Sequence, residues 1–267
     1  MVGVGLFSMQ TIIIGAALLF GWLVARRSAR AWSGEKYRAA GGALLDAAFV
    51  GFVVARLAYI VQWWPEYSAT PKSMVAISDG GFLWWVGIPV SLAFVWWRTR
   101  ECVMLRRSAL TGMIAGVALW VVANGVLSLL LRSVPPLPDL QVTTLAGQPV
   151  SLSQYEGRPV VLNLWASWCP PCRREMPAFE QAQQAFPDIA FVMLNQGESA
   201  VTAQRFLESE GLDLTDVLLD PTSKAMQAVR SRGLPTTLFF DAQGRQVDSH
   251  LGEITMAGIK DKILRRF

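Results

Sequence analysis

Histidine and cysteine are scarce in this chain of 267 residues, which contains one histidine, His250, and three cysteines. Zinc in proteins normally takes four ligands from cysteine, histidine and carboxylate side chains. Two intervening residues separate Cys169 from Cys172, whereas Cys102 lies far from both. The sequence therefore does not supply a second ligand pair, and we expect no metal site. We interpret Cys169 and Cys172 as a redox dithiol.

Long apolar runs fill the first half of the chain, and they make the whole chain, at 52% hydrophobic residues, more apolar than a soluble domain needs. Each run approaches or exceeds the ~17–25 residues that a helix needs to cross a bilayer. The third run is the shortest and contains Pro89. We predict an all-α membrane domain over residues 1–132, with four transmembrane helices at about 2–25, 39–61, 81–97 and 109–131.

No lysine or arginine precedes the first apolar run, which excludes the usual charge pattern of a signal peptide. Basic residues instead follow the first run and lie between the third and fourth runs. The positive-inside rule places these two loops in the cytoplasm. We therefore predict an inner-membrane protein whose N-terminus, 63–80 loop and chain after Arg132 face the periplasm. An outer aromatic belt is expected from Trp63, Trp64, Tyr67, Trp84 and Trp85.

No cysteine lies within a predicted span, which excludes a dithiol relay inside the membrane half. Cys102 falls in a predicted cytoplasmic loop and is expected to stay reduced. The net charge of +4 could suggest a nucleic-acid partner, but the basic residues cluster beside apolar runs. Because no nucleic-acid-binding motif is present, we expect no such partner.

The second half of the chain alternates between strand and helix patterns after a proline-rich linker at 133–138. This alternation predicts an α/β domain over residues 139–267. The expected strands are 140–143, 150–152, 160–165, 189–194, 216–219, 236–240 and 246–250. The expected helices are 173–186, 201–210, 223–232 and 256–266.

The cysteine pair lies where the apolar strand 160–165 gives way to the helix that follows. Free N–H groups and the helix dipole stabilise a thiolate at such a helix N-terminus. Cys169 is therefore the expected nucleophile. Cys172, one turn further along, would resolve the mixed disulfide formed with a partner. Pro170 and Pro171 restrict the motif between them.

Two groups of residues in this half carry a family resemblance. They are the run from Trp165 to Glu175, followed by Met176-Pro177, and Gly233-Leu234-Pro235-Thr236-Thr237 with Phe239-Phe240-Asp241 behind it. Over about residues 138–267 the chain resembles the TlpA/ResA-like branch of the thioredoxin superfamily.

The resemblance implies a thioredoxin-fold domain that uses the Cys169–Cys172 disulfide and needs no other cofactor. It implies a proton-handling role for Glu175 and a cis-proline at Pro235 that faces the dithiol. Leu234 would pair its backbone with the substrate strand, and Trp168 and Pro170 would contact substrate beside the exposed sulfur. It also implies a transmembrane electron donor of the DsbD/CcdA kind.

The first half has a second resemblance, carried by Ala55-Arg56-Leu57-Ala58-Tyr59, Asp79-Gly80-Gly81 and Gly87. These residues are similar to the front part of prolipoprotein diacylglyceryl transferases. That family places an essential histidine four residues after the second glycine, where this chain has Trp85. The resemblance implies a truncated scaffold that serves as an anchor or a docking surface.

The combined prediction is an all-α membrane domain followed by an α/β thioredoxin-fold domain. We expect a membrane-anchored oxidoreductase that reduces disulfides in envelope proteins. A thiol oxidase or isomerase that uses the same cysteines is an alternative. Alternatives of other classes are a lipoprotein- or lipid-modifying membrane protein with a regulatory redox domain, and a non-enzymatic membrane adaptor.

Overall fold

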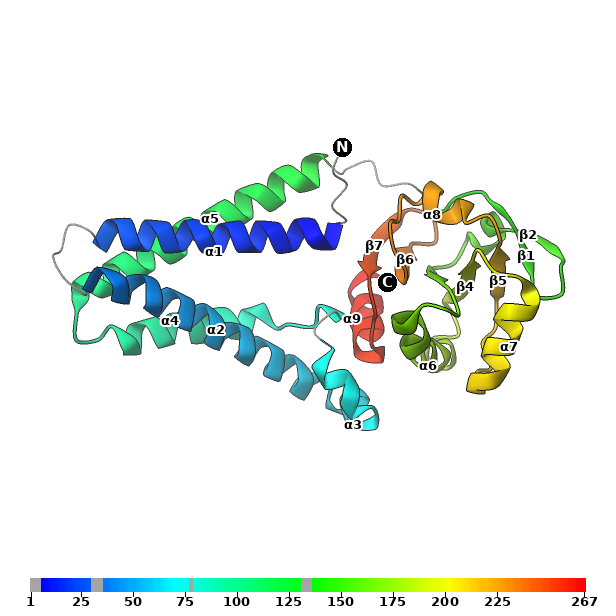
Figure 1. Ribbon diagram of the computed structural model, residues 1–267, viewed down its shortest axis with the longest axis horizontal. Coiled ribbons are helices and arrows are strands. Elements are labelled where there is room, and N and C mark those ends of the chain that lie inside the picture. Colours follow the sequence, from blue (N-terminus) through cyan, green and yellow to red (C-terminus); the bar gives the residue numbers. More distant parts are fainter. Residues whose placement is uncertain (1–5, 30–35, 77–78, 131–135) are drawn as a thin grey trace. The chain divides into compact units, whose positions relative to one another are not determined.

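The computed structural model describes residues 6–29, 36–76, 79–130 and 136–267 (Figure 1). It contains two compact units, one formed by Met1–Trp64 with Gly81–Arg132 and the other by Pro65–Gly80 with Ser133–Phe267. The start of the predicted first span, the last residue of the fourth and residues 133–135 of the predicted linker lie outside the described residues.

The first unit is helical, with α1 (Leu6–Ser28), α2 (Lys36–Gln62), α4 (Trp84–Arg98) and α5 (Val103–Leu130). A helix lies in each predicted apolar segment. Within the described residues, two stretches are long and apolar enough to cross a bilayer, Gly41–Gln62 and Val103–Leu127. Helix α4 has 15 residues, about 22 Å at 1.5 Å per residue, against a ~30 Å hydrocarbon core. The helices are confirmed, whereas four spans remain a prediction.

Small residues let these helices approach closely. A Cβ added to Gly21 of α1 would lie 2.7 Å from the carbonyl oxygen of Gly112 on α5. A Cβ added to Gly87 of α4 would lie 2.6 Å from the carbonyl oxygen of Gly51 on α2. Ser91 of α4 also donates a 2.9 Å hydrogen bond to the Ala47 carbonyl oxygen. Such backbone-to-backbone contact at small residues is typical of helices that associate in membranes.

The second unit is built on a seven-stranded mixed sheet with the order β2-β1-β5-β4-β3-β6-β7. Strands β3, β4 and β5 run parallel, and the pairings of β3 with β6 and β6 with β7 are antiparallel. The strands are β1 (Gln141–Thr144), β2 (Pro149–Ser151), β3 (Val160–Trp165), β4 (Ala190–Gln196), β5 (Val217–Asp220), β6 (Thr236–Phe240) and β7 (Gln246–Leu251). All seven lie within a residue or two of their predicted positions.

Helices cover both faces of this sheet, which explains why β3 and β4 are largely apolar and buried along their whole length. One face buries side chains of α6 (Pro170–Ala185), α7 (Ala200–Glu210) and α9 (Met256–Arg266). The other face packs against α8 (Lys224–Ala228) and the 3₁₀ turn η4 (Leu152–Tyr155). The central strands therefore hold the cysteine-bearing helix α6 against a rigid core.

Helix α8 is shorter than the predicted 223–232. It begins after Ser223 and ends before Arg230, and both of these residues have positive φ angles, 52° and 55°. A left-handed backbone conformation cannot continue a right-handed helix. The chain is then free to turn back into the loop before β6.

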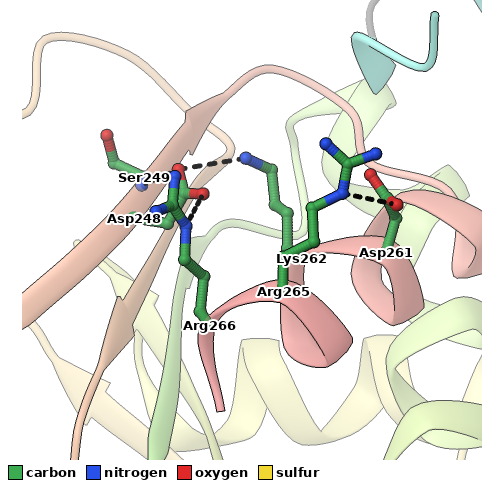
Figure 2. Close-up of polar contacts among 6 residues, drawn as sticks. All are labelled: Asp248, Ser249, Asp261, Lys262, Arg265 and Arg266. Atoms are coloured by element: carbon green, nitrogen blue, oxygen red, sulfur yellow. Dashed lines mark hydrogen bonds and ion pairs between the residues drawn. The ribbon is translucent and has the colours of Figure 1, made fainter. Parts of the chain in front are cut away.

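Charged side chains fix the C-terminal helix α9 to strand β7 (Figure 2). Asp248 on β7 accepts hydrogen bonds from Lys262 Nζ at 3.1 Å and from Arg266 Nε at 3.0 Å. Burial alone would raise the pKa of Asp248, but these two cations hold it below its usual value. Arg265, on the outer side of the helix, pairs instead with Asp261. The network therefore holds α9 in place from one side.

The segment Pro65–Gly80 belongs to the second unit, although it connects two helices of the first. It contains the end of α3 (Trp64–Ala69) and the 3₁₀ helix η2 (Pro71–Val75). Tyr67 is fully buried, with its hydroxyl 2.6 Å from Asp79 Oδ2. The prediction that Tyr67 belongs to a lipid-facing aromatic belt is therefore wrong, because protein atoms cover this ring.

Candidate active site

The cysteine pair lies at the junction of β3 and α6. Cys169 is the N-cap residue of α6, and its sulfur accepts a 3.3 Å hydrogen bond from the Cys172 backbone N–H. Pro170 and Pro171 occupy the first turn, where the missing N–H of proline would have no helical partner in any case. The helix begins three residues before the predicted Arg173, because these prolines already have helical conformation. A disulfide joins Cys169 and Cys172.

Both cysteines are largely shielded from solvent. Cys169 keeps 3% of its surface exposed and Cys172 none. Trp168, immediately before Cys169, is 68% exposed, and Pro170 on the other side is also exposed. Trp168 and Pro170 are thus the exposed residues on either side of Cys169 in the chain.

Glu175 lies one turn after Cys172, on a similar face of α6, and only 1% of its surface is exposed. Asn163 Nδ2 of β3 donates a 2.8 Å hydrogen bond to its Oε1, and the Ile254 backbone N–H donates a 3.0 Å bond to its Oε2. Burial raises the pKa of Glu175 to about 8, although both hydrogen bonds lower it. This carboxyl can therefore exchange a proton near neutral pH.

The loop before β6 approaches the same end of β3. Leu164 pairs with Thr236 in the antiparallel register, so the preceding Pro235 lies level with the end of β3 and the start of the cysteine turn. The Leu234–Pro235 peptide bond is cis. Leu234 is half-buried and packs against the cores on both faces of the sheet. The Pro235 carbonyl oxygen accepts a 2.9 Å bond from the Gly252 N–H.

This geometry can be compared with known proteins. Residues 135–247 match the model of the AhpC/TSA family. The thioredoxin-like protein YneN of Bacillus subtilis is 33% identical over 128 residues, which cover 47% of this chain and 75% of YneN. The thiol-disulfide oxidoreductase ResA of Bacillus subtilis is 30% identical over 126 residues, 46% of this chain and 70% of ResA. The chain belongs to the family of thioredoxin-like thiol-disulfide oxidoreductases.

A solved structure is also similar to this oxidoreductase. It is a secreted Mycobacterium tuberculosis disulfide oxidoreductase described as homologous to DsbE of E. coli. It is 25% identical, covers 48% of this chain and 96% of its own, and has a TM-score of 0.43. The predicted α/β thioredoxin-fold domain and the predicted enzyme class are confirmed by the family match and the relatives. The match ends at residue 247, so it includes the cysteine pair, Glu175 and Pro235 but not Ile254.

Sequence reasoning missed Glu198, which also shapes the oxidoreductase site. Its carboxylate accepts from the Ser167 N–H at 2.7 Å, from the Ser167 hydroxyl at 2.5 Å and from Asn195 Nδ2 at 2.6 Å. Ser167 lies in the turn that carries Cys169. The position of Glu198 in the sequence could have revealed it. This residue follows β4, the parallel neighbour of β3, and the carboxyl ends of parallel strands lie at the same edge of a sheet, next to the cysteine turn.

His250, the one histidine, is buried at the end of β7. Its Nε2 lies 3.1 Å from the Glu253 carbonyl oxygen, so it helps to hold the turn before α9. Burial lowers the pKa of His250, and nearby Lys262 adds to this effect. Both influences disfavour the charged form of the ring.

Proposed function

We propose that this protein is a membrane-anchored thiol-disulfide oxidoreductase that reduces disulfides in envelope proteins through Cys169 and Cys172. The observation that carries the proposal is the arrangement on α6. A sulfur caps the helix, a second and fully buried sulfur lies one turn inside, and a buried carboxyl with a raised pKa lies one turn further. A nucleophile, a resolving thiol and a base thus follow one another along a single helix.

The reaction begins with the reduced dithiol. The Cys169 thiolate, stabilised at the helix N-terminus, attacks one sulfur of a client disulfide and forms a mixed disulfide while the client's other sulfur leaves as a thiolate. Glu175 takes the proton of the Cys172 thiol. The Cys172 thiolate then attacks Cys169 Sγ and releases the second client sulfur. Two electrons pass to the client, and the enzyme is left with the disulfide present in the structure.

Client binding is assigned to the surface around Cys169. Trp168 offers a large exposed aromatic ring and Pro170 an exposed apolar edge. The cis Leu234–Pro235 loop, level with the cysteine turn, is suited to pair with an extended client strand through the Leu234 backbone. Recognition through backbone hydrogen bonds suits an enzyme with several protein clients.

The helical unit is proposed as the anchor. Its helices expose large apolar side chains, including Phe49 at 69%, Val61 at 71% and Ile114 at 68%, as a lipid-facing surface requires. The small-residue contacts of α1 with α5 and of α2 with α4 support the same view. The four apolar runs support four spans, and the basic loops between them support a redox domain on the periplasmic side. A transmembrane thiol carrier of the DsbD/CcdA kind would then restore the dithiol.

The direction of electron flow is tested by the reduction potential of the Cys169–Cys172 pair. Full-length protein in detergent micelles is equilibrated with defined ratios of reduced and oxidised glutathione or dithiothreitol, and the free thiols are counted. A potential near that of thioredoxin, about −270 mV, supports a reductase. A potential near that of DsbA, about −120 mV, would assign an oxidase instead. Cys169→Ser and Cys172→Ser variants serve as blanks.

A further inference from the structure

The turn between β7 and α9, residues 252–255, contacts several parts of the active site. The Gly252 N–H donates to the Pro235 carbonyl oxygen at 2.9 Å. The Glu253 carboxylate pairs with Arg174 on α6 at 2.5 Å. The Ile254 N–H holds the Glu175 carboxyl. The position of this turn therefore determines whether the Ile254 N–H can donate to the Glu175 carboxyl.

The same turn also contacts the segment Pro65–Gly80. Thr255 donates a 3.3 Å hydrogen bond from its hydroxyl to Asp79 Oδ2, and the Tyr67 hydroxyl donates to the same oxygen at 2.6 Å. One turn into α9, Lys260 forms a 2.6 Å ion pair with Glu66. These contacts join two ends of the segment to the beginning of one helix.

The contact with Asp79 is closely packed. Asp79 has 4% of its surface exposed and Tyr67 none. A Cβ added to Gly258 of α9 would lie 3.1 Å from Ile254 Cγ1 and 3.7 Å from the Asp79 carbonyl oxygen. A Cβ at Gly258 would therefore crowd Ile254 in the turn and would touch Asp79 at ordinary van der Waals distance. Because Gly258 has no side chain, Asp79, Thr255 and Ile254 can pack closely around it.

We propose that Asp79 is a positioning residue for the redox site: by holding the Thr255 hydroxyl it fixes the turn so that the Ile254 N–H stays on Glu175. Thr255 directly follows Ile254 in the chain, so a displacement of one moves the other. The inference rests on the proposed proton-handling role of Glu175. It gives the segment between α2 and α4 a function in the reaction, beyond that of a connecting loop.

Several groups around Glu175 affect its pKa, and a test must distinguish loss of the Ile254 N–H from changes in the others. Its charged neighbour on the turn is Glu253, which raises the pKa of Glu175 and is itself paired with Arg174. Asn163 contributes a neutral amide, and Cys172 lies on the same helix. The Ile254 N–H lowers the pKa of Glu175, so loss of this donor must raise it.

The experiment follows the Glu175 carboxyl directly in full-length, oxidised protein, where the two cysteines do not titrate. Glutamate labelled with carbon-13 at the side-chain carboxyl is incorporated, the protein is held in detergent micelles, and NMR spectra are recorded from pH 4 to 10. Glu175→Gln identifies the resonance by removing it. We expect a wild-type midpoint near 8.

Asp79→Ala is expected to raise that midpoint by about one unit, the effect of losing one hydrogen bond to a charged group. Asp79→Asn removes the charge but keeps an acceptor oxygen for Tyr67 and Thr255, so its midpoint stays at the wild-type value. Glu66→Gln breaks the ion pair with Lys260 away from the turn and also leaves the midpoint unchanged. Tyr67→Phe, a mild change should Asp79→Ala fail to fold, shifts it upward by a smaller amount.

The outcomes separate this inference from the function on which it rests. An unchanged or lowered midpoint in Asp79→Ala, or in Tyr67→Phe where Asp79→Ala does not fold, would overturn the role of Asp79. An equal rise of the midpoint in Glu66→Gln would overturn it too. General loosening of the segment Pro65–Gly80 would then be enough to explain the shift, without a specific role for Asp79. A wild-type midpoint near the ordinary value of 4.5 would instead refute the proton-handling role of Glu175 itself.

Discussion

Asn163 lies in the middle of the central strand β3 and binds Glu175, a residue of the helix that carries the cysteines. Its side-chain nitrogen donates at 2.8 Å to Glu175 Oε1 and at 3.2 Å to the Thr237 hydroxyl of β6. An amide inside an otherwise apolar strand is costly unless it is bonded. Here it stabilises the charged form of the buried Glu175 carboxyl and keeps its pKa from rising further.

Replacement of Asn163 by leucine, which has a similar volume, should raise the pKa of Glu175 above about 8. The change removes a bond that lowers this pKa and makes the surroundings less polar. Carbon-13 NMR of the labelled carboxyl measures the shift. Gln183→Leu is the control, because Gln183 lies on α6 as Glu175 does, but its amide donates to the Phe191 carbonyl oxygen instead. A midpoint that falls, or moves equally in both variants, would contradict the account.

Glu175 should also make stability depend on pH. Its folded-state pKa of about 8 exceeds the reference value of 4.5, so the folded protein binds the extra proton between these values. Its contribution is complete below pH 4.5 and is lost as pH rises toward 8, by at most about 5 kcal/mol at 1.4 kcal/mol per unit.

This loss can be measured as the urea midpoint of the redox unit at pH 5, 6.5 and 8, followed by pulse proteolysis. Glu175→Gln, which cannot ionise, should flatten the decline while it slows resolution of a mixed disulfide. A decline as steep in Glu175→Gln as in the wild type would assign the pH dependence to other groups.

Glu198→Ala should loosen the turn that carries Cys169, because Ser167 loses the acceptor for its N–H and its hydroxyl. We expect a loss of about 2 kcal/mol in the free energy of unfolding and a fall of roughly tenfold in the rate of disulfide reduction, since small misplacements of reacting groups are costly. Glu208→Ala is the control, an exposed glutamate bonded to Gln204 on the same helix. Wild-type rates in Glu198→Ala would exclude a clamping role.

The fold of the redox domain was largely predictable, because its signals are local. Strand β3 was predicted at its observed bounds, since a short apolar run preceded by Gly157 and Pro159 favours a buried strand over a helix. Helix α9 was likewise predicted at Met256–Arg266 from its amphipathic pattern. The cysteine spacing and the strand-to-helix junction were sufficient to predict the redox dithiol.

The parts that sequence reasoning missed depend on contacts distant in the chain. Asn163 and Glu175 are 12 residues apart and Thr255 and Asp79 are 176 apart. No periodicity encodes such pairs. Arg56 illustrates the same limit, because its partner Gly81 lies 25 residues away in the chain. It is buried and donates to the Gly81 carbonyl oxygen at 3.0 Å.

The proposed orientation can be tested with Cys102, which has no disulfide partner. In a Cys169→Ser, Cys172→Ser background, a membrane-impermeant maleimide should leave Cys102 unlabelled in spheroplasts and label it after permeabilisation. Lys72→Cys, at an exposed position in the Pro65–Gly80 segment, should be labelled in both cases. Labelling of Cys102 in intact spheroplasts would reverse the proposed topology.

The central claim is that Cys169 attacks disulfides of envelope proteins and Cys172 resolves the product. Its most direct test is a trap with full-length Cys172→Ala in native membranes, followed by identification of the proteins that stay disulfide-linked to Cys169. The account predicts a defined set of envelope proteins together with a transmembrane thiol carrier, all absent from the Cys169→Ala, Cys172→Ala variant. A quinone-coupled oxidant as the trapped partner, or no adduct beyond that background, would contradict it.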